Sequence, residues 1–164
     1  MCNNLFTRTQ DVWLFGNSAN SIWPSLSTPD QGDSAWRPRQ VMDWETFWRR
    51  ASKVNCILPK RLVLLADASA LSHEIIFQIQ QYRAQNALFS PVIHFDKPDL
   101  CKFIHTFNSD LAGYCAATDT NEEMGRLLRA VCAGKHYYSP GFCQMVEDLG
   151  FPIARGDDDE YIKN

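Results

Sequence analysis

Cysteine and histidine are the side chains of this sequence best suited to bind a metal ion or to attack a substrate. The six cysteines stand singly along the chain, at Cys2, Cys56, Cys101, Cys115, Cys132 and Cys143. The four histidines are equally scattered, at His73, His94, His105 and His136. Neither set contains a CxxC pair or a spacing typical of zinc ligands. The sequence therefore predicts no metal site and no disulfide framework, and we expect most of the cysteines to be small buried side chains.

Enzyme motifs are also absent from the sequence. It contains no GxSxG, no glycine-rich phosphate loop and no paired catalytic motif. The sequence therefore predicts that the protein is not an enzyme and has no catalytic residues.

The balance of charge bears on possible partners. The chain has 16 Lys and Arg residues against 19 Asp and Glu residues, a formal net charge of -3. A module that binds nucleic acid by itself is expected to be basic, so we expect any DNA contact to be made by another part of the protein. No apolar run approaches the roughly 20 residues that span a bilayer, and the N-terminus lacks a signal-peptide pattern. We therefore expect a cytoplasmic protein with no membrane contact.

Short apolar runs alternate with amphipathic helical patterns, which is typical of a parallel sheet covered by helices on both faces. The runs predict strands over residues 11–15, 36–42, 62–66, 91–95 and 113–116. Continuous apolar strands indicate burial on both faces. We therefore predict an α/β fold, a flavodoxin-like doubly wound five-stranded parallel sheet with strand order 2-1-3-4-5. Ligands of such sheets lie beyond the carboxyl ends of the strands, near the first and third.

Helix starts are marked by capping residues. Those of four helices are Asp43, Ser72, the capping box Thr120 to Glu123, and Ser139-Pro140. Pro98 fits the first turn of the helix after the fourth strand. The helix after the first strand, over residues 20–26, contains Pro24, so we expect it to be short or irregular.

The segment from Ala112 to Phe142, AGYCAATDTNEEMGRLLRAVCAGKHYYSPGF, resembles the end of the receiver domain in NarL/LuxR-type bacterial response regulators. In that family a glycine-tyrosine strand precedes a capped helix that ends in a motif of the form AVxAGxxYxSP. Upstream, RLVLLADASAL resembles the third receiver strand with its phosphoacceptor aspartate, and PVIHFDKPD resembles the fourth strand. The resemblance implies a receiver-like domain over residues 1–150, followed over residues 151–164 by a C-terminal tail or the start of a linker.

The resemblance also identifies the positions of phosphoryl chemistry. Receivers that accept a phosphoryl group carry an acidic pair after the first strand, an aspartate after the third, a hydroxyl after the fourth and a lysine after the fifth. The acids hold Mg²⁺, and the hydroxyl and lysine hold the product. At these positions this chain has Gly16 and Asn17, then Asp67, then Asp96, and finally Ala116 or Ala117. Compared with the family's pocket, this one is degenerate, so we expect no cofactor and no bound Mg²⁺. A phosphoryl group would also be repelled by Asp96 without a compensating cation.

Two of these residues, Asp67 and Asp96, and also Tyr114 have an interpretation that involves no signalling. Asp67 can be a relic or a cap for the loop after its strand, which we favour over a working phosphoacceptor. Asp96 can mimic the charge of a bound phosphate, but an interaction with the next helix N-terminus is simpler. Tyr114 matches the family's switch aromatic, whose ring rotates inward on activation, and an aromatic in a buried strand can equally be core.

The function that follows is a non-enzymatic, atypical (pseudo-)receiver domain of a bacterial transcription regulator or a stand-alone adaptor. It would act as a homodimer or through a protein partner, using its fourth helix, fifth strand and fifth helix, independently of aspartyl phosphorylation. DNA would be reached only through a helix-turn-helix domain, of which residues 153–164 show no pattern. Two alternatives stay open: a phosphorylatable receiver with an unusual pocket centred on Asp67, and a receiver-like module that binds a small ligand such as a nucleotide.

Overall fold

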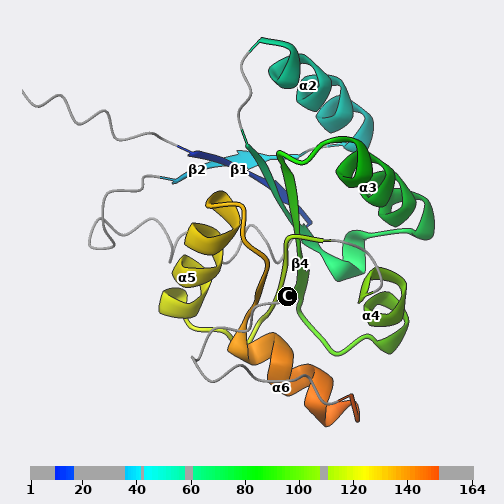
Figure 1. Ribbon diagram of the computed structural model, residues 1–164. Coiled ribbons are helices and arrows are strands. Elements are labelled where there is room, and N and C mark those ends of the chain that lie inside the picture. Colours follow the sequence, from blue (N-terminus) through cyan, green and yellow to red (C-terminus); the bar gives the residue numbers. More distant parts are fainter. Residues whose placement is uncertain (1–9, 17–35, 42, 58–60, 108–110, 152–164) are drawn as a thin grey trace, which may run out of the picture.

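A six-stranded parallel sheet with helices on both faces forms the centre of the protein (Figure 1). The computed structural model describes residues 10–16, 36–41, 43–57, 61–107 and 111–151, and for residues 52–57 the backbone only. In chain order the elements are β1 (Gln10–Phe15), β2 (Trp36–Gln40), α2 (Trp44–Ile57), β3 (Leu62–Asp67), a short 3-10 helix η1 (Ala68–Ala70), α3 (His73–Gln85), β4 (Phe89–Phe95), α4 (Leu100–Phe107), β5 (Gly113–Ala116), α5 (Asn121–Cys132), β6 (Tyr137–Tyr138) and α6 (Pro140–Asp148).

The strand order is β2-β1-β3-β4-β5-β6, and every neighbouring pair is parallel. This confirms the predicted α/β flavodoxin-like fold and its order 2-1-3-4-5. The sixth strand was not predicted, because Tyr137 and Tyr138 are too few residues to give a strand pattern. They pair with Gly113 and Tyr114 at the edge of the sheet.

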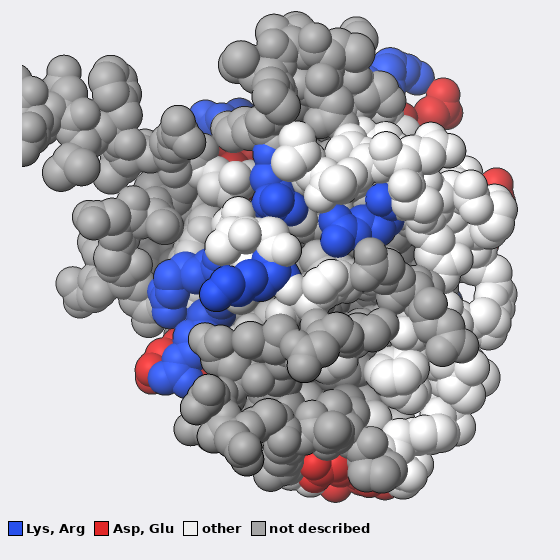
Figure 2. Space-filling model, viewed as in Figure 1, with Lys and Arg blue, Asp and Glu red and all other residues white. Residues whose placement is uncertain are grey.

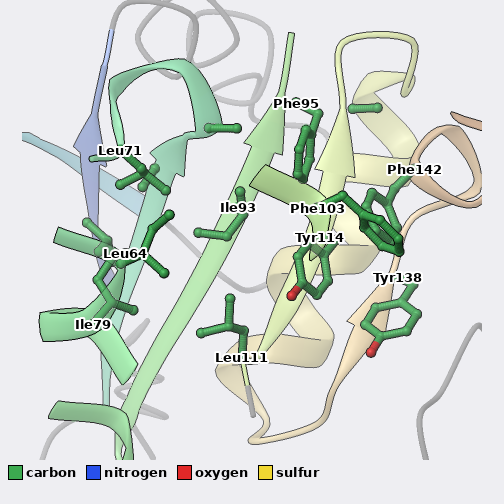
Figure 3. Packing of buried hydrophobic residues seen from close by; sticks show 14 of the residues in the cluster. Leu64, Leu71, Ile79, Ile93, Phe95, Phe103, Leu111, Tyr114, Tyr138 and Phe142 are labelled. Carbon is green, nitrogen blue, oxygen red and sulfur yellow. The ribbon is translucent and has the colours of Figure 1, made fainter. Parts of the chain in front are cut away.

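Two hydrophobic clusters cover the two faces of the sheet. Side chains alternate along a strand, so Leu64 and Ala66 of β3 belong to one cluster, and Val63 and Leu65 belong to the other. Helices α2, α3, α4 and α6 pack into the first cluster, part of which is seen in Figure 3, and α5 packs into the second. All residues of β3 and β4 are consequently buried.

The predicted helix starts are confirmed by hydrogen bonds, with one correction. Caps are formed by Asp43, by Ser72, by Ser139 and by Thr120, whose capping box with Glu123 is complete. At α4 the cap is Asp99, whose carboxylate accepts the N–H of Lys102 at 3.0 Å. The helix therefore begins after Pro98. Asp99, and not Asp96 as expected, interacts with its N-terminus, because the Asp99 side chain stands three residues before the N–H of Lys102. Residues 20–26 lie outside the described residues. Within the described chain, no helix is long and apolar enough to cross a membrane.

Asp119 connects the end of β5 to the start of α6. Its carboxylate accepts hydrogen bonds from the N–H of Ala116 (2.7 Å), from the N–H of Gly141 (2.7 Å) and from the hydroxyl of Ser139. A Cβ at position 141 would lie 2.6 Å from Asp119 Oδ1, so the close approach requires glycine. Burial raises the pKa of Asp119, and the three hydrogen bonds oppose that shift. The side chain therefore fixes α6 against the sheet.

Replacing Asp119 by alanine leaves three donors without their acceptor, and we expect the free energy of unfolding to fall by about 1–3 kcal/mol. The pKa of Asp119 is higher in the folded chain than its ordinary value. The stability that this shift contributes is therefore fully present at pH values below the ordinary pKa, and it is lost as pH rises through the raised pKa. The difference between the chain and Asp119→Ala, measured by urea unfolding, should therefore be larger in mildly acidic than in neutral solution. Glu122→Ala, which removes only an exposed ion pair with Arg126, is the control and should cost less than about 1 kcal/mol. A difference that grows towards neutral pH would contradict the raised pKa.

Candidate functional site

The carboxyl ends of β1 and β3 bring together two of the residues singled out by the sequence. Asp67 is the last residue of β3, and Gly16 follows the neighbouring strand β1. Gly16 has a φ of 103°, and a Cβ added there would collide with Asp67 Oδ2. The carboxylate of Asp67 is therefore packed against the backbone after β1. Asn17 lies outside the described residues.

His94 of β4 is the hydrogen-bond partner of Asp67. The two residues are opposite each other in the β3–β4 register, and His94 Nδ1 lies 3.0 Å from Asp67 Oδ1. Both side chains are 1% exposed. A carboxylate can only accept, so the bond requires the imidazole proton on Nδ1. His94 Nε2 is buried and finds no hydrogen-bond partner among the described residues.

The sequence analysis placed His94 among scattered histidines and so missed this pair. The available signal was a titratable side chain within the apolar run 91–95, because a polar residue on a doubly buried strand needs a partner. Asp67, at the end of the preceding strand, was the nearest candidate. The parallel pairing of β3 with β4 is what makes them neighbours.

Cys115 of β5 lies beside the Asp67–His94 pair, so that β3, β4 and β5 each contribute one residue to a row across the sheet. It stands opposite His94 in the β4–β5 register and is completely buried. Burial raises the pKa of this thiol well above its ordinary value, and the charges of Asp119 and Asp67 raise it further. A protonated, enclosed thiol is a poor nucleophile. Cys115 is therefore a packing residue.

The other predicted positions lie around the end of β4. Asp96 follows this strand and is exposed, in contrast to Asp67. Ala116 stands opposite Phe95, and the N–H of Ala117 donates to the Phe95 carbonyl at 2.9 Å. Both alanines contribute only backbone polar groups here. Within the described part of the chain, no three His, Cys, Asp or Glu side chains are grouped to hold a metal ion.

Tyr114 points into the core beside β4 and α6. Its side chain is 1% exposed, and its hydroxyl donates to the Thr106 carbonyl in α4 at 2.6 Å. The ring stacks on Phe142 of α6 with centroids 4.6 Å apart (Figure 3). Burial raises the pKa of the Tyr114 phenol, so it is a neutral donor at physiological pH. The Tyr114 ring is thus held in the core by α4 and α6.

Comparisons with known proteins give a structural likeness only. No protein-family model and no curated protein sequence matches this chain. The isolated REC domain of RcsB from Salmonella enterica serovar Typhimurium, in its apo form, is similar with a TM-score of 0.61 and 15% identity, over 86% of this chain and 98% of that chain. In the presence of the phosphomimetic BeF3-, the same domain is similar with a TM-score of 0.61 and 12% identity, over 84% of this chain and 99% of that chain. A LuxR-family two-component response regulator from Aurantimonas sp. gives 0.61 and 14%, over 87% and 98%.

This chain has the receiver-domain fold. The low identities extend the likeness no further than the fold, which these response-regulator domains share. The apo and BeF3--bound forms of RcsB give the same TM-score, so overall shape does not distinguish the two states.

A double-mutant cycle tests the coupling of Asp67 to His94. Removing one member leaves the other buried without its main partner, so we expect Asp67→Ala and His94→Ala each to lower the free energy of unfolding by about 3–5 kcal/mol. The double variant should lose less than the sum of the two, with a coupling of about 0.5–3 kcal/mol. Urea unfolding of the four proteins measures both quantities. Strictly additive losses would show that the two side chains do not stabilise each other.

Proposed function

We propose that this chain is the atypical receiver module of a bacterial transcription regulator or of a stand-alone adaptor. It works by dimerising or by binding a protein partner, without aspartyl phosphorylation, and any DNA contact is made by a separate helix-turn-helix domain. The observation that carries the proposal is the environment of Asp67. Its Oδ1 bonds to His94, its Oδ2 faces the Gly16 backbone, and its side chain is 1% exposed. A phosphoacceptor must instead meet a phosphodonor and Mg²⁺ with these same oxygens.

Charge compensation supports the same proposal. A phosphoryl group adds nearly two negative charges, which a receiver balances with metal and lysine. No lysine stands anywhere between Phe103 and Arg129, so no shift in alignment restores one after β5. The residue at the family's hydroxyl position is a further carboxylate, the exposed Asp96, which supplies no positive charge. The negative charge of a phosphoryl group on Asp67 would therefore not be balanced by a cation of the protein.

The inward position of Tyr114 supports a signalling face that is fixed in one arrangement. In the family that the sequence resembles, this ring moves inward on activation. Here the Thr106 carbonyl and the Phe142 ring hold it in the core. Leaving this position would break a buried hydrogen bond and a stacked aromatic contact.

Exposed apolar side chains on and near α4 supply a surface for a partner. Leu100 and Ile104 lie one turn apart on α4 and are 40% and 52% exposed. Phe151, after α6, is 41% exposed and packs its ring against Phe103 at 5.6 Å. We name Leu100, Ile104 and Phe151 the α4 surface. Apolar surface of this kind is a common feature of protein contacts.

Incubation with a small acyl phosphate and Mg²⁺ tests independence from phosphorylation. We expect the intact mass of the chain to stay unchanged, because both Asp67 oxygens are covered. The apo REC domain of RcsB, treated in parallel, shows whether the donor is active. A labile phosphoryl adduct that appears on this chain and is lost in Asp67→Asn would overturn the proposal in favour of a working receiver.

Sedimentation of the chain over a range of concentrations tests the α4 surface. If the chain pairs through it, Ile104→Glu should weaken dimerisation by at least about tenfold, because a charge would be buried in the contact. Phe77→Glu is the matched control, since Phe77 is 59% exposed on α3 and outside the α4 surface. A dimer that survives Ile104→Glu, or dissociates only in Phe77→Glu, would place the contact elsewhere. A monomer at every concentration would exclude the homodimer and leave the partner-binding form of the proposal.

A further inference from the structure

A pocket of about 220 Å³ lies at the end of the sheet opposite Asp67, beside the last turns of α5 and the start of β6. Four basic side chains line it: Arg126, Arg129, Lys135 and His136. Alanines 130 and 133 and Tyr137 complete the lining. In Figure 2, Lys and Arg side chains gather over α5.

The basic side chains reach the pocket from three pieces of backbone. Arg126 and Arg129 stand three residues apart and so share one face of α5, Lys135 comes from the following turn, and His136 precedes β6. His136 is oriented by a hydrogen bond from Nδ1 to the Leu111 carbonyl, 2.9 Å long. Arg61 lies close to the turn after α5, since a Cβ added at Gly134 would be 2.8 Å from its guanidinium group. The concavity is therefore lined by one sign of charge, which focuses the electrostatic field.

The positive charge of the pocket is only partly balanced. Arg126 pairs with Glu122 at 2.7 Å. Within the described chain, neither Arg129 nor Lys135 forms an ion pair. The net charge of -3 argued against a phosphate-binding surface, but that value averages over the whole sequence and does not describe this pocket.

A simpler explanation is that these residues complement the negative C-terminal end of α5. The last carbonyls of this helix already accept backbone hydrogen bonds, among them those from Gly134 to Val131 and from Lys135 to Ala130. Complementing a helix end also requires no concave arrangement. Two guanidinium groups and an ammonium around one hollow are instead the donors that recognise phosphate.

We propose that this pocket binds the phosphate or diphosphate group of a small ligand. Pockets that enclose a whole drug-sized ligand measure about 300–1,000 Å³. The smaller volume here suits one or two phosphate groups, with the rest of the ligand extending into solvent. Tyr137 is 3% exposed and so offers no ring face on which a base could stack. This site does not depend on the state of Asp67.

Amide NMR of the full chain, titrated with pyrophosphate at low ionic strength, tests the proposal. We expect saturable shifts confined to residues 126–137 and Arg61. Arg129→Gln and Lys135→Gln should each weaken binding about tenfold or more, because each removes a charge-assisted donor. Arg49→Gln removes the same charge from an exposed ion pair on α2 and should leave the affinity unchanged. All three positions are exposed, and unchanged spectra elsewhere will show that the variants remain folded.

Three results would overturn the proposal. The first is a titration without saturable shifts, and the second is equal affinity in the chain and in Arg129→Gln. The third is tight binding of a DNA duplex with no response to pyrophosphate, which would show that the basic residues recognise a nucleic-acid backbone and not a small phosphorylated ligand.

Discussion

Burial of both faces of β3 and β4 is the constraint on which the rest of the structure depends. Every side chain of these strands is enclosed, so each polar group on them needs a partner inside the protein. Asp67 and His94 meet that need through Oδ1 and Nδ1, although His94 Nε2 finds no partner among the described residues. At the other end of β4, Ser90 bonds to Arg61 in the same way. Asp67, Ser90 and His94 of the central strands thus each have a side-chain hydrogen-bond partner within the described chain.

The opposite face of the sheet shows how the fold can hold one conformation without a ligand. Tyr114, Phe142, Phe95, Phe103 and Tyr138 form a connected set of aromatic contacts between β4, β5, β6, α4 and α6 (Figure 3). Asp119 fixes the start of α6, which carries Phe142 into this set. Moving the Tyr114 ring would therefore disturb the packing of several elements together.

The sequence predicted the elements far better than the site. Strand positions and four helix caps follow from local patterns, such as the apolar run 62–66 and the capping box at Thr120, which are read directly from the chain. The strand order followed from the fold class that those elements indicate. The Asp67–His94 pair spans 27 residues of sequence and exists only through strand register. The close packing of Gly16 against Asp67 has the same origin, since the glycine's neighbour is set by the β1–β3 pairing. The basic pocket also joins residues of a helix, a turn and a strand start, which a chain-wide charge balance conceals.

Gly16 limits which side chains can stand at the end of β1. A new carboxylate at this position would need a Cβ where Asp67 Oδ2 lies, on a backbone with a φ of 103° that side chains rarely adopt. An acidic side chain at position 16 would thus require both a different backbone conformation there and a displaced Asp67 carboxylate. The two residues therefore constrain each other, so a larger side chain at position 16 and the present place of the Asp67 carboxylate exclude one another.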